Sequence, residues 1–128
     1  MISKIFIKYA TMLFMLFTLN FCAKKDLTAT IYHAVPAQTN SDPEHTASMY
    51  RLDLNDPYKH RILAVSRDLQ EAGYTFGTTV NVSCDCPYEG EWVVEDLMNK
   101  RYENRIDFLI NEDMEQGKWE NVEILKLN

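Results

Sequence analysis

Short stretches in which apolar and polar residues alternate recur along the chain from residue 27 to residue 127. A period of two is the pattern of a half-buried strand, and no segment shows the spacing of a long amphipathic helix. The alternation predicts strands at residues 27–32, 79–83, 91–95, 105–110 and 122–127, and the uninterrupted apolar run in 61–65 predicts a further strand that is buried on both faces. Six short strands joined by turns indicate an all-β protein in which the sheet closes into a barrel.

Two short helical turns are expected between these strands. Asp68 and Glu71 have the spacing of an N-cap residue and its N3 partner, and Gly73 is placed to end a one-turn helix. A capping carboxylate accepts backbone N–H groups and has a lowered pKa, so Asp68 is predicted to hold the fold and not to donate a proton. A second helical turn is expected at residues 112–116, before Gly117.

Residues 34–58 form the longest segment without periodicity, and they are rich in Pro, Asn, Asp and Ser. An ordered loop of this length in a small domain is more often functional than not. This segment is therefore expected to contribute to a binding site.

Residues 1–21 have the pattern of an export signal. Lys4 and Lys8 supply positive charge, and the apolar run at 9–19 is too short to span a bilayer. Cys22 follows where a lipoprotein carries its lipidated cysteine, which predicts a membrane-anchored protein of the cell envelope. Residues 22–27 would then be a tether and 28–128 a single domain. Cleavage after Ala23, giving a soluble secreted protein, and an uncleaved anchor are the alternatives.

The charge balance excludes one large class of partner. The full chain has 13 Lys and Arg against 19 Asp and Glu, and loss of Lys4 and Lys8 with the signal changes the net charge from −6 to −8. Nucleic-acid binding depends on basic residues that neutralise phosphates, so no nucleic-acid partner is expected. A glycan partner remains compatible with this charge.

Neither the cysteines nor the histidines have the spacing of a metal site. Cys84 and Cys86 are two apart, a separation at which a mutual disulfide is rarely relaxed, so two free thiols on a connection are expected. The three histidines, His33, His45 and His60, are not spaced as metal ligands or as part of a Ser-His-Asp triad. No metal and no cofactor is predicted.

Two aspartates are candidates for acid–base chemistry. Asp96 follows the apolar run at 92–94 and Asp107 lies in the run at 106–110, and these runs are expected to pair as neighbouring strands around a polar connection. The apolar neighbours of Asp107 should raise its pKa, and a charged Asp96 should raise it further. Two carboxyl groups in different environments suit acid and base roles. The alternative is a pair of solvated turn residues.

Segments 62–68, 76–80, 92–96 and 104–107 resemble, in order and spacing, the 3D domain, which is named for three aspartates. This domain is a double-psi β-barrel found in the membrane-bound lytic transglycosylase A family and, more distantly, in rare-lipoprotein-A-like proteins and expansins. The resemblance covers roughly residues 28–127. It implies a six-stranded double-psi β-barrel.

The resemblance also implies an activity. The family acid matches Asp107 and protonates the bond between N-acetylmuramic acid and N-acetylglucosamine in peptidoglycan, after which the muramyl 6-hydroxyl closes on C1. Asp96 would be the positioning partner of this acid, and Arg105 also occupies a family position.

Further cleft residues are expected, from the resemblance and from the polar connection. Thr46-Ala-Ser48 matches a Thr-Ala-Ser/Thr-Gly motif that lines the family cleft, with Met49 in place of the glycine. Tyr102, in the polar connection, is a candidate for stacking on a sugar.

The functional hypothesis is thus an exported lytic transglycosylase with an Asp general acid. The alternatives are a non-catalytic cell-wall binding module and a periplasmic accessory or inhibitor protein. Because family members have a second domain that forms the other wall of the groove, a protein partner that completes the groove is a further expectation.

Overall fold

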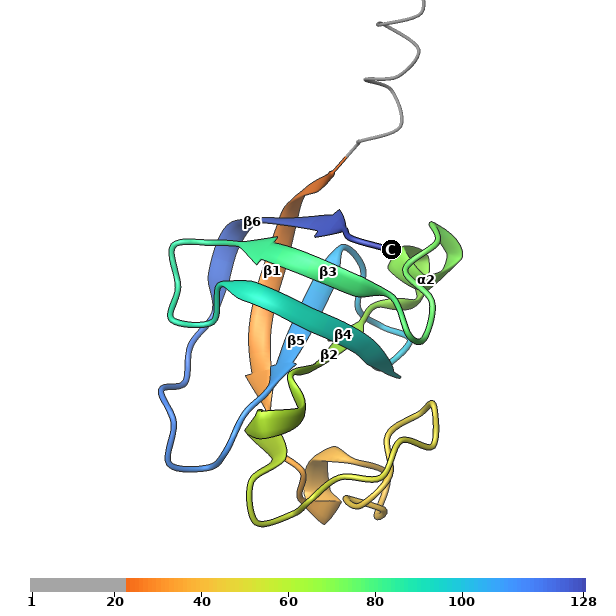
Figure 1. Ribbon diagram of the computed structural model, residues 1–128, viewed down its shortest axis with the longest axis vertical. Coiled ribbons are helices and arrows are strands. Elements are labelled where there is room, and N and C mark those ends of the chain that lie inside the picture. Colours follow the sequence, from red (N-terminus) through yellow and green to blue (C-terminus); the bar gives the residue numbers. More distant parts are fainter. Residues whose placement is uncertain (1–22) are drawn as a thin grey trace, which may run out of the picture.

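The computed structural model describes residues 23–128, and the predicted signal segment with Cys22 lies outside this range. Its six strands form one closed barrel in the order β1-β5-β2-β4-β3-β6 (Figure 1). The strands are β1 (Lys24–Tyr32), β2 (Ile62–Val65), β3 (Thr79–Ser83), β4 (Gly90–Leu97), β5 (Arg105–Leu109) and β6 (Trp119–Lys126). The predicted all-β, six-stranded barrel is confirmed.

Two strand pairs in the barrel are parallel. These are β1 with β5 and β2 with β4, whereas the other four pairings are antiparallel. Parallel neighbours need a connection that crosses the barrel, so strands that follow one another in sequence are often not adjacent in space. Two such crossover connections are consistent with the double-psi topology that the resemblance implied.

The inside of the barrel is filled by large apolar side chains. Trp92 and Phe108 lie with ring centroids 4.8 Å apart, and Tyr88 contacts both rings. All four residues of β2 are buried, as expected from its uninterrupted apolar composition. Burial of these side chains, at about 25 cal/mol per Å² of apolar surface, is the main source of the barrel's stability.

The first strand starts earlier than its alternation indicates. Lys24 pairs with Ile124 and Leu27 pairs with Val122, so most of the segment expected as a tether is part of the barrel. Asp26 has a φ angle of 58° between these two pairs, where the register shifts. A bulge at this point disrupts the alternation on which the sequence interpretation relied.

The helical predictions are partly correct. Helix α2 (Arg67–Glu71) follows β2, and Gly73, with a φ angle of 108°, ends this region as expected. Its N-cap is Ser66 and not Asp68, which lies in the first turn. The helical turn expected at 112–116 is wrong. That segment makes a single turn from Asn111 to Met114, whose side chain packs against the core.

Residues 33–60 gather at one end of the barrel (Figure 1). The segment contains two short 3-10 helices, η2 (Pro36–Gln38) and η3 (Pro57–His60), each with a proline in its first turn. Its one isolated β-bridge joins His45 to Arg51. The long loop predicted from composition is therefore ordered by local contacts.

The expectation for the cysteines is wrong, because Cys84 and Cys86 form a disulfide. The turn after β3 brings their Cα atoms to 5.2 Å, within the usual range for a disulfide. Both side chains pack against the core, and the Cys84 N–H donates to the Glu89 carboxylate. Within residues 23–128, none of the helices has the length and apolar character needed to span a bilayer.

Candidate functional site

A cleft of about 820 Å³ lies between the barrel and the long loop. Four parts of the chain line it: the loop at 37–49, Arg67 at the start of α2, the polar connection at 97–102, and side chains of four strands. The strand residues are Ile31 and Tyr32 of β1, Ala64 of β2, Asp96 of β4 and Asp107 of β5. The volume is in the range of small-ligand sites in proteins.

The two candidate aspartates reach this cleft from strands that are not neighbours. The expected pairing of their strands is wrong, because β2 lies between β4 and β5 in the barrel. Ala64 of β2 is the register partner of both, opposite Asp107 on one side and Asp96 on the other. Its side chain is a single methyl group, so the floor of the cleft between the two carboxyl groups stays open.

A bulge in β4 decides which acidic residue faces Ala64. Leu63 pairs with Val94, but the next pair joins Ala64 to Asp96, so Glu95 is the extra residue on β4. In a regular ladder Glu95 would stand opposite Ala64. Bulges of this kind redirect side chains at functional sites, and here the bulge places Asp96 on the floor of the cleft.

Asp107 has the environment of a proton donor. Burial raises its pKa from 3.8 to about 7, and the negative charge of Asp96 acts in the same direction. The Thr30 hydroxyl, which donates to Oδ1 over 3.1 Å, and the charge of Arg105 both oppose this rise. Burial outweighs them, as expected for a carboxyl group in an apolar strand.

Asp96 has a different environment, in which both of its oxygens accept hydrogen bonds. Oδ1 accepts from the backbone N–H groups of Ala47 and Leu97 at 2.9 and 3.0 Å. Oδ2 accepts from the Tyr32 hydroxyl at 2.8 Å. Three donors fix the orientation of this carboxylate on the floor of the cleft.

The loop that carries the Thr-Ala-Ser motif is attached to the same strand. Ser48 donates from its backbone N–H to the Glu95 carbonyl and from its hydroxyl to the Glu95 carboxylate, at 3.2 and 2.6 Å. Met49 has a φ angle of 69°, a left-handed conformation that glycine adopts without strain. Its side chain is 70% exposed, so no burial offsets this conformation.

The expected substrate-binding residues fall into two groups. Thr46 and Tyr102 line the cleft, whereas Ser48 and Arg105 are absent from its described lining. Ser48 is turned toward Glu95, and the Arg105 guanidinium lies 4.7 Å from the centre of the Tyr102 ring. Arg101 lies over the same ring at 4.7 Å, so Tyr102 already stacks with two cations.

Asp68 lies outside the cleft and has a structural environment. Its Oδ2 accepts the backbone N–H of Asn104, in the connection before β5, at 3.0 Å. Burial would raise its pKa, but hydrogen bonds from the Ser66 hydroxyl and from backbone N–H groups outweigh burial and lower it. This hydrogen bond to Asn104 supports the structural role predicted for Asp68, although Asp68 is not an N-cap residue.

Sequence reasoning missed Tyr32, Thr30 and Ala64. The alternation at 27–32 carried a signal for the first two, because residues 30 and 32 of a strand share one face. Nothing in the sequence marked Ala64, whose importance comes only from its place between two distant strands. His45 also lines the cleft, whereas His33 is buried and its side chain is absent from the described lining.

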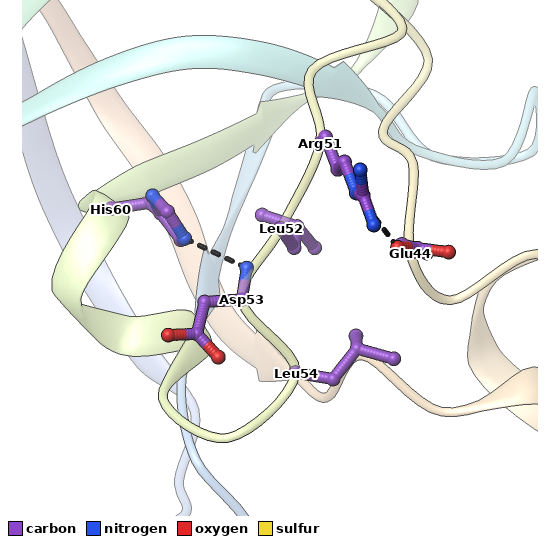
Figure 2. Close-up of a pocket in the computed structure, with 6 residues that line it drawn as sticks. All are labelled: Glu44, Arg51, Leu52, Asp53, Leu54 and His60. Atoms are coloured by element: carbon purple, nitrogen blue, oxygen red, sulfur yellow. Dashed lines mark hydrogen bonds and ion pairs between the residues drawn. The ribbon is translucent and has the colours of Figure 1, made fainter.

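A smaller pocket of about 480 Å³ lies within the long loop (Figure 2). In Figure 2, His60 accepts the Asp53 backbone N–H at 2.9 Å, and Arg51 pairs with Glu44 at 2.8 Å. Its polar groups thus largely contact one another. Leu52 and Leu54 complete the lining. The hydrogen bond from Lys59 lowers the pKa of Asp53 in this pocket, the opposite of the shift at Asp107 in the main cleft.

Within residues 23–128, no group of three or more His, Cys, Asp or Glu side chains is arranged to hold a metal ion. Comparison with known proteins finds no family model, no curated protein and no solved structure that matches this chain. The resemblance to the 3D domain therefore remains a hypothesis that depends on the sequence pattern alone.

Proposed function

We propose that this protein acts on peptidoglycan at the cell envelope and cleaves the bond between N-acetylmuramic acid and N-acetylglucosamine, with Asp107 as general acid. The single observation that carries the proposal is the state of Asp107. This carboxyl group lines an open cleft, yet its pKa is raised to about 7, so a large fraction stays protonated near neutral pH. A general acid works best when its pKa lies near the working pH.

In the proposed step, Asp107 gives its proton to the glycosidic oxygen while the bond from that oxygen to C1 breaks. The 6-hydroxyl of the same muramyl residue attacks C1 and releases its proton to the Asp107 carboxylate. One bond is broken, one ring is closed, and the acid is regenerated without water. Because the Thr30 hydroxyl donates to Oδ1, Oδ2 is the oxygen that would carry the transferred proton.

Asp96 would support this step without transferring a proton. Its two oxygens are held by Tyr32, Ala47 and Leu97. A fixed negative charge near the cleft favours the positive charge that develops at C1 when the bond breaks. The same charge helps to keep Asp107 protonated.

The test is incubation of the purified full chain with peptidoglycan sacculi, followed by mass spectrometry for 1,6-anhydro muropeptides. We expect product from the wild type and from the control Asp113→Asn, whose parent side chain is exposed. Asp107→Asn should release none but should still pellet with sacculi. Absence of product in the wild type would overturn cleavage.

The pelleting arm separates the remaining hypotheses. Wild-type protein that pellets with sacculi but releases nothing would be a cell-wall binding module. Protein that neither pellets nor releases product would favour the accessory or inhibitor hypothesis, with the barrel as a scaffold for a protein partner. The lipid anchor on Cys22 is tested separately, by the mass of the mature N-terminus.

A further inference from the structure

The cleft has a cationic rim, defined here as Arg67, Lys100 and Arg101, although the chain as a whole is acidic. All three side chains are exposed. Within residues 23–128 the carboxylate ion pairs involve His45, Arg51, Lys59 and Lys118, and none involves a rim residue. The positive charges of the rim are therefore not neutralised by the protein's own carboxylates.

The rim is held in place by the surrounding structure. Arg67 is the first residue of α2, directly after the strand that carries Ala64. Arg101 donates from Nη2 to the Tyr102 hydroxyl at 2.6 Å, and its backbone N–H donates to the Asn99 side chain at 3.1 Å. Such contacts reduce the entropy lost when a guanidinium binds a ligand.

The carboxylates inside the cleft do not compete for these cations. Asp96 uses both oxygens for the donors described above, and Asp42 pairs with His45 at 3.3 Å. Asp107 retains its proton over much of the range below pH 7. The cleft thus combines a largely protonated acid on its floor with free positive charge at its rim.

We propose that the cationic rim binds carboxylate groups carried by the glycan, so that the cleft selects acidic over neutral oligosaccharides. The inference deepens the proposed function, on which it rests, because a muramyl residue without a stem peptide carries a free lactyl carboxylate and a chitin residue carries none. Guanidinium and ammonium groups pair with carboxylates through charge-assisted hydrogen bonds. A neutral glycan would gain nothing from the rim. An acidic glycan is repelled by a chain of net charge −6, and its attraction to the cationic rim must outweigh this repulsion.

The test is calorimetric titration of the full chain with two probes of equal length. One is an alternating GlcNAc–MurNAc oligosaccharide without stem peptides, and the other is the neutral chitooligosaccharide. We expect the acidic probe to bind at least about tenfold more tightly at low salt, with this preference lost as salt is raised, because ionic contacts are screened. Equal affinity for the two probes, or no binding of either, would overturn the inference.

A pair of matched triple variants shows whether the rim causes the preference. Arg67→Gln, Lys100→Gln and Arg101→Gln together should remove the preference for the acidic probe, measured as the ratio of the affinities of this variant for the two probes. Lys24→Gln, Lys25→Gln and Lys118→Gln together remove the same charge outside the cleft and should keep the preference. If the first variant kept the preference for the acidic probe, or if both variants lost it, the role of the rim would be refuted. Because the readout is binding, a protein that selects the acidic probe but releases no anhydro product would retain this inference and lose the proposed cleavage.

Discussion

The Tyr32 hydroxyl donates a hydrogen bond of 2.8 Å to Oδ2 of Asp96, from the end of the first strand to a strand 64 residues later in the sequence. Burial and the charge of Asp96 raise the pKa of Tyr32 well above 10, so this donor keeps its proton at any working pH. The contact connects the two parallel strand pairs of the barrel at the floor of the cleft. It therefore fixes the orientation of Asp96 relative to Asp107.

Tyr32→Phe should reduce glycan cleavage by about tenfold, because Asp96 loses one of its three donors, and should lower the free energy of unfolding by about 1 kcal/mol. The measurement is the initial rate of anhydro-muropeptide release together with urea unfolding. Tyr88→Phe is the matched control, since it also removes a hydrogen bond of a buried phenol, the one to the Glu115 carbonyl, and neither residue belongs to the described cleft lining. An equal loss of rate in both variants would show that Tyr32 acts only through stability.

Substitutions of Ala64 should affect the cleft according to their volume. Ala64 is 3% exposed and lies between the two aspartates, so a larger side chain would fill the floor. We expect Ala64→Ser to keep most activity, whereas Ala64→Val should lose nearly all of it and about 1 to 3 kcal/mol of stability from overpacking. The affinity for the acidic oligosaccharide, measured by calorimetry, should fall in the same order. Full affinity in Ala64→Val would show that ligands do not reach the floor.

Much of the barrel could be predicted from the sequence because its strands alternate in polarity. The strand with Ile106 and Phe108 illustrates this, since two buried apolar neighbours also predicted the raised pKa of Asp107. These features depend on adjacent residues, which a sequence displays directly. The strand order was not predicted, and the one expected pairing, between the strands that carry Asp96 and Asp107, is wrong.

The remaining features depend on contacts between distant residues. Two parallel crossovers insert β2 between β4 and β5, and no local pattern indicates that Ala64 will separate two aspartates. The pairing of Cys84 with Cys86 was missed for another reason. The general rule against short disulfide loops does not take account of the turn that brings these two Cα atoms to 5.2 Å.

The pH dependence of cleavage should report the protonation of Asp107. Activity should decline above pH 7, where the acid loses its proton. Because the Thr30 hydrogen bond lowers the pKa of Asp107, Thr30→Val should move this decline to higher pH, by up to about one unit. Thr28→Val is the control, since the Thr28 hydroxyl bonds Glu120 instead. The measurement is kcat/KM between pH 5 and 9, and an unchanged or lowered midpoint in Thr30→Val would contradict the assignment.

Asp107 should also reduce the stability of the fold at neutral pH. In the folded state its pKa is about 7 against 3.8 for an unperturbed carboxyl group, so between these values the folded protein holds a proton that the unfolded chain has lost. Stability must therefore fall as pH rises through this window and level off above it. Asp107→Asn should be more stable than wild type at pH 8 by roughly 2 to 4 kcal/mol, and the two should converge near pH 4. Parallel stability curves for the two proteins would show that Asp107 is solvated.

Asp68 should behave in the opposite way, which separates the structural aspartate from the proposed acid. Its pKa is lowered in the folded state, so it contributes stability above the unfolded pKa that is lost as pH falls through the folded value. Asp68→Asn should lose about 1 to 2 kcal/mol at pH 7, because the Asn104 N–H then faces a weaker acceptor. Urea unfolding at pH 7 and pH 3 is the measurement, and the loss should be smaller at the lower pH.

Since Asn104 ends the connection that carries Lys100 and Arg101, the Asp68→Asn variant should also weaken the preference for acidic oligosaccharides. An Asp68→Asn protein that gained stability at pH 7, as Asp107→Asn should, would mean that Asp68 is also a destabilised acid and that the two roles are wrongly divided.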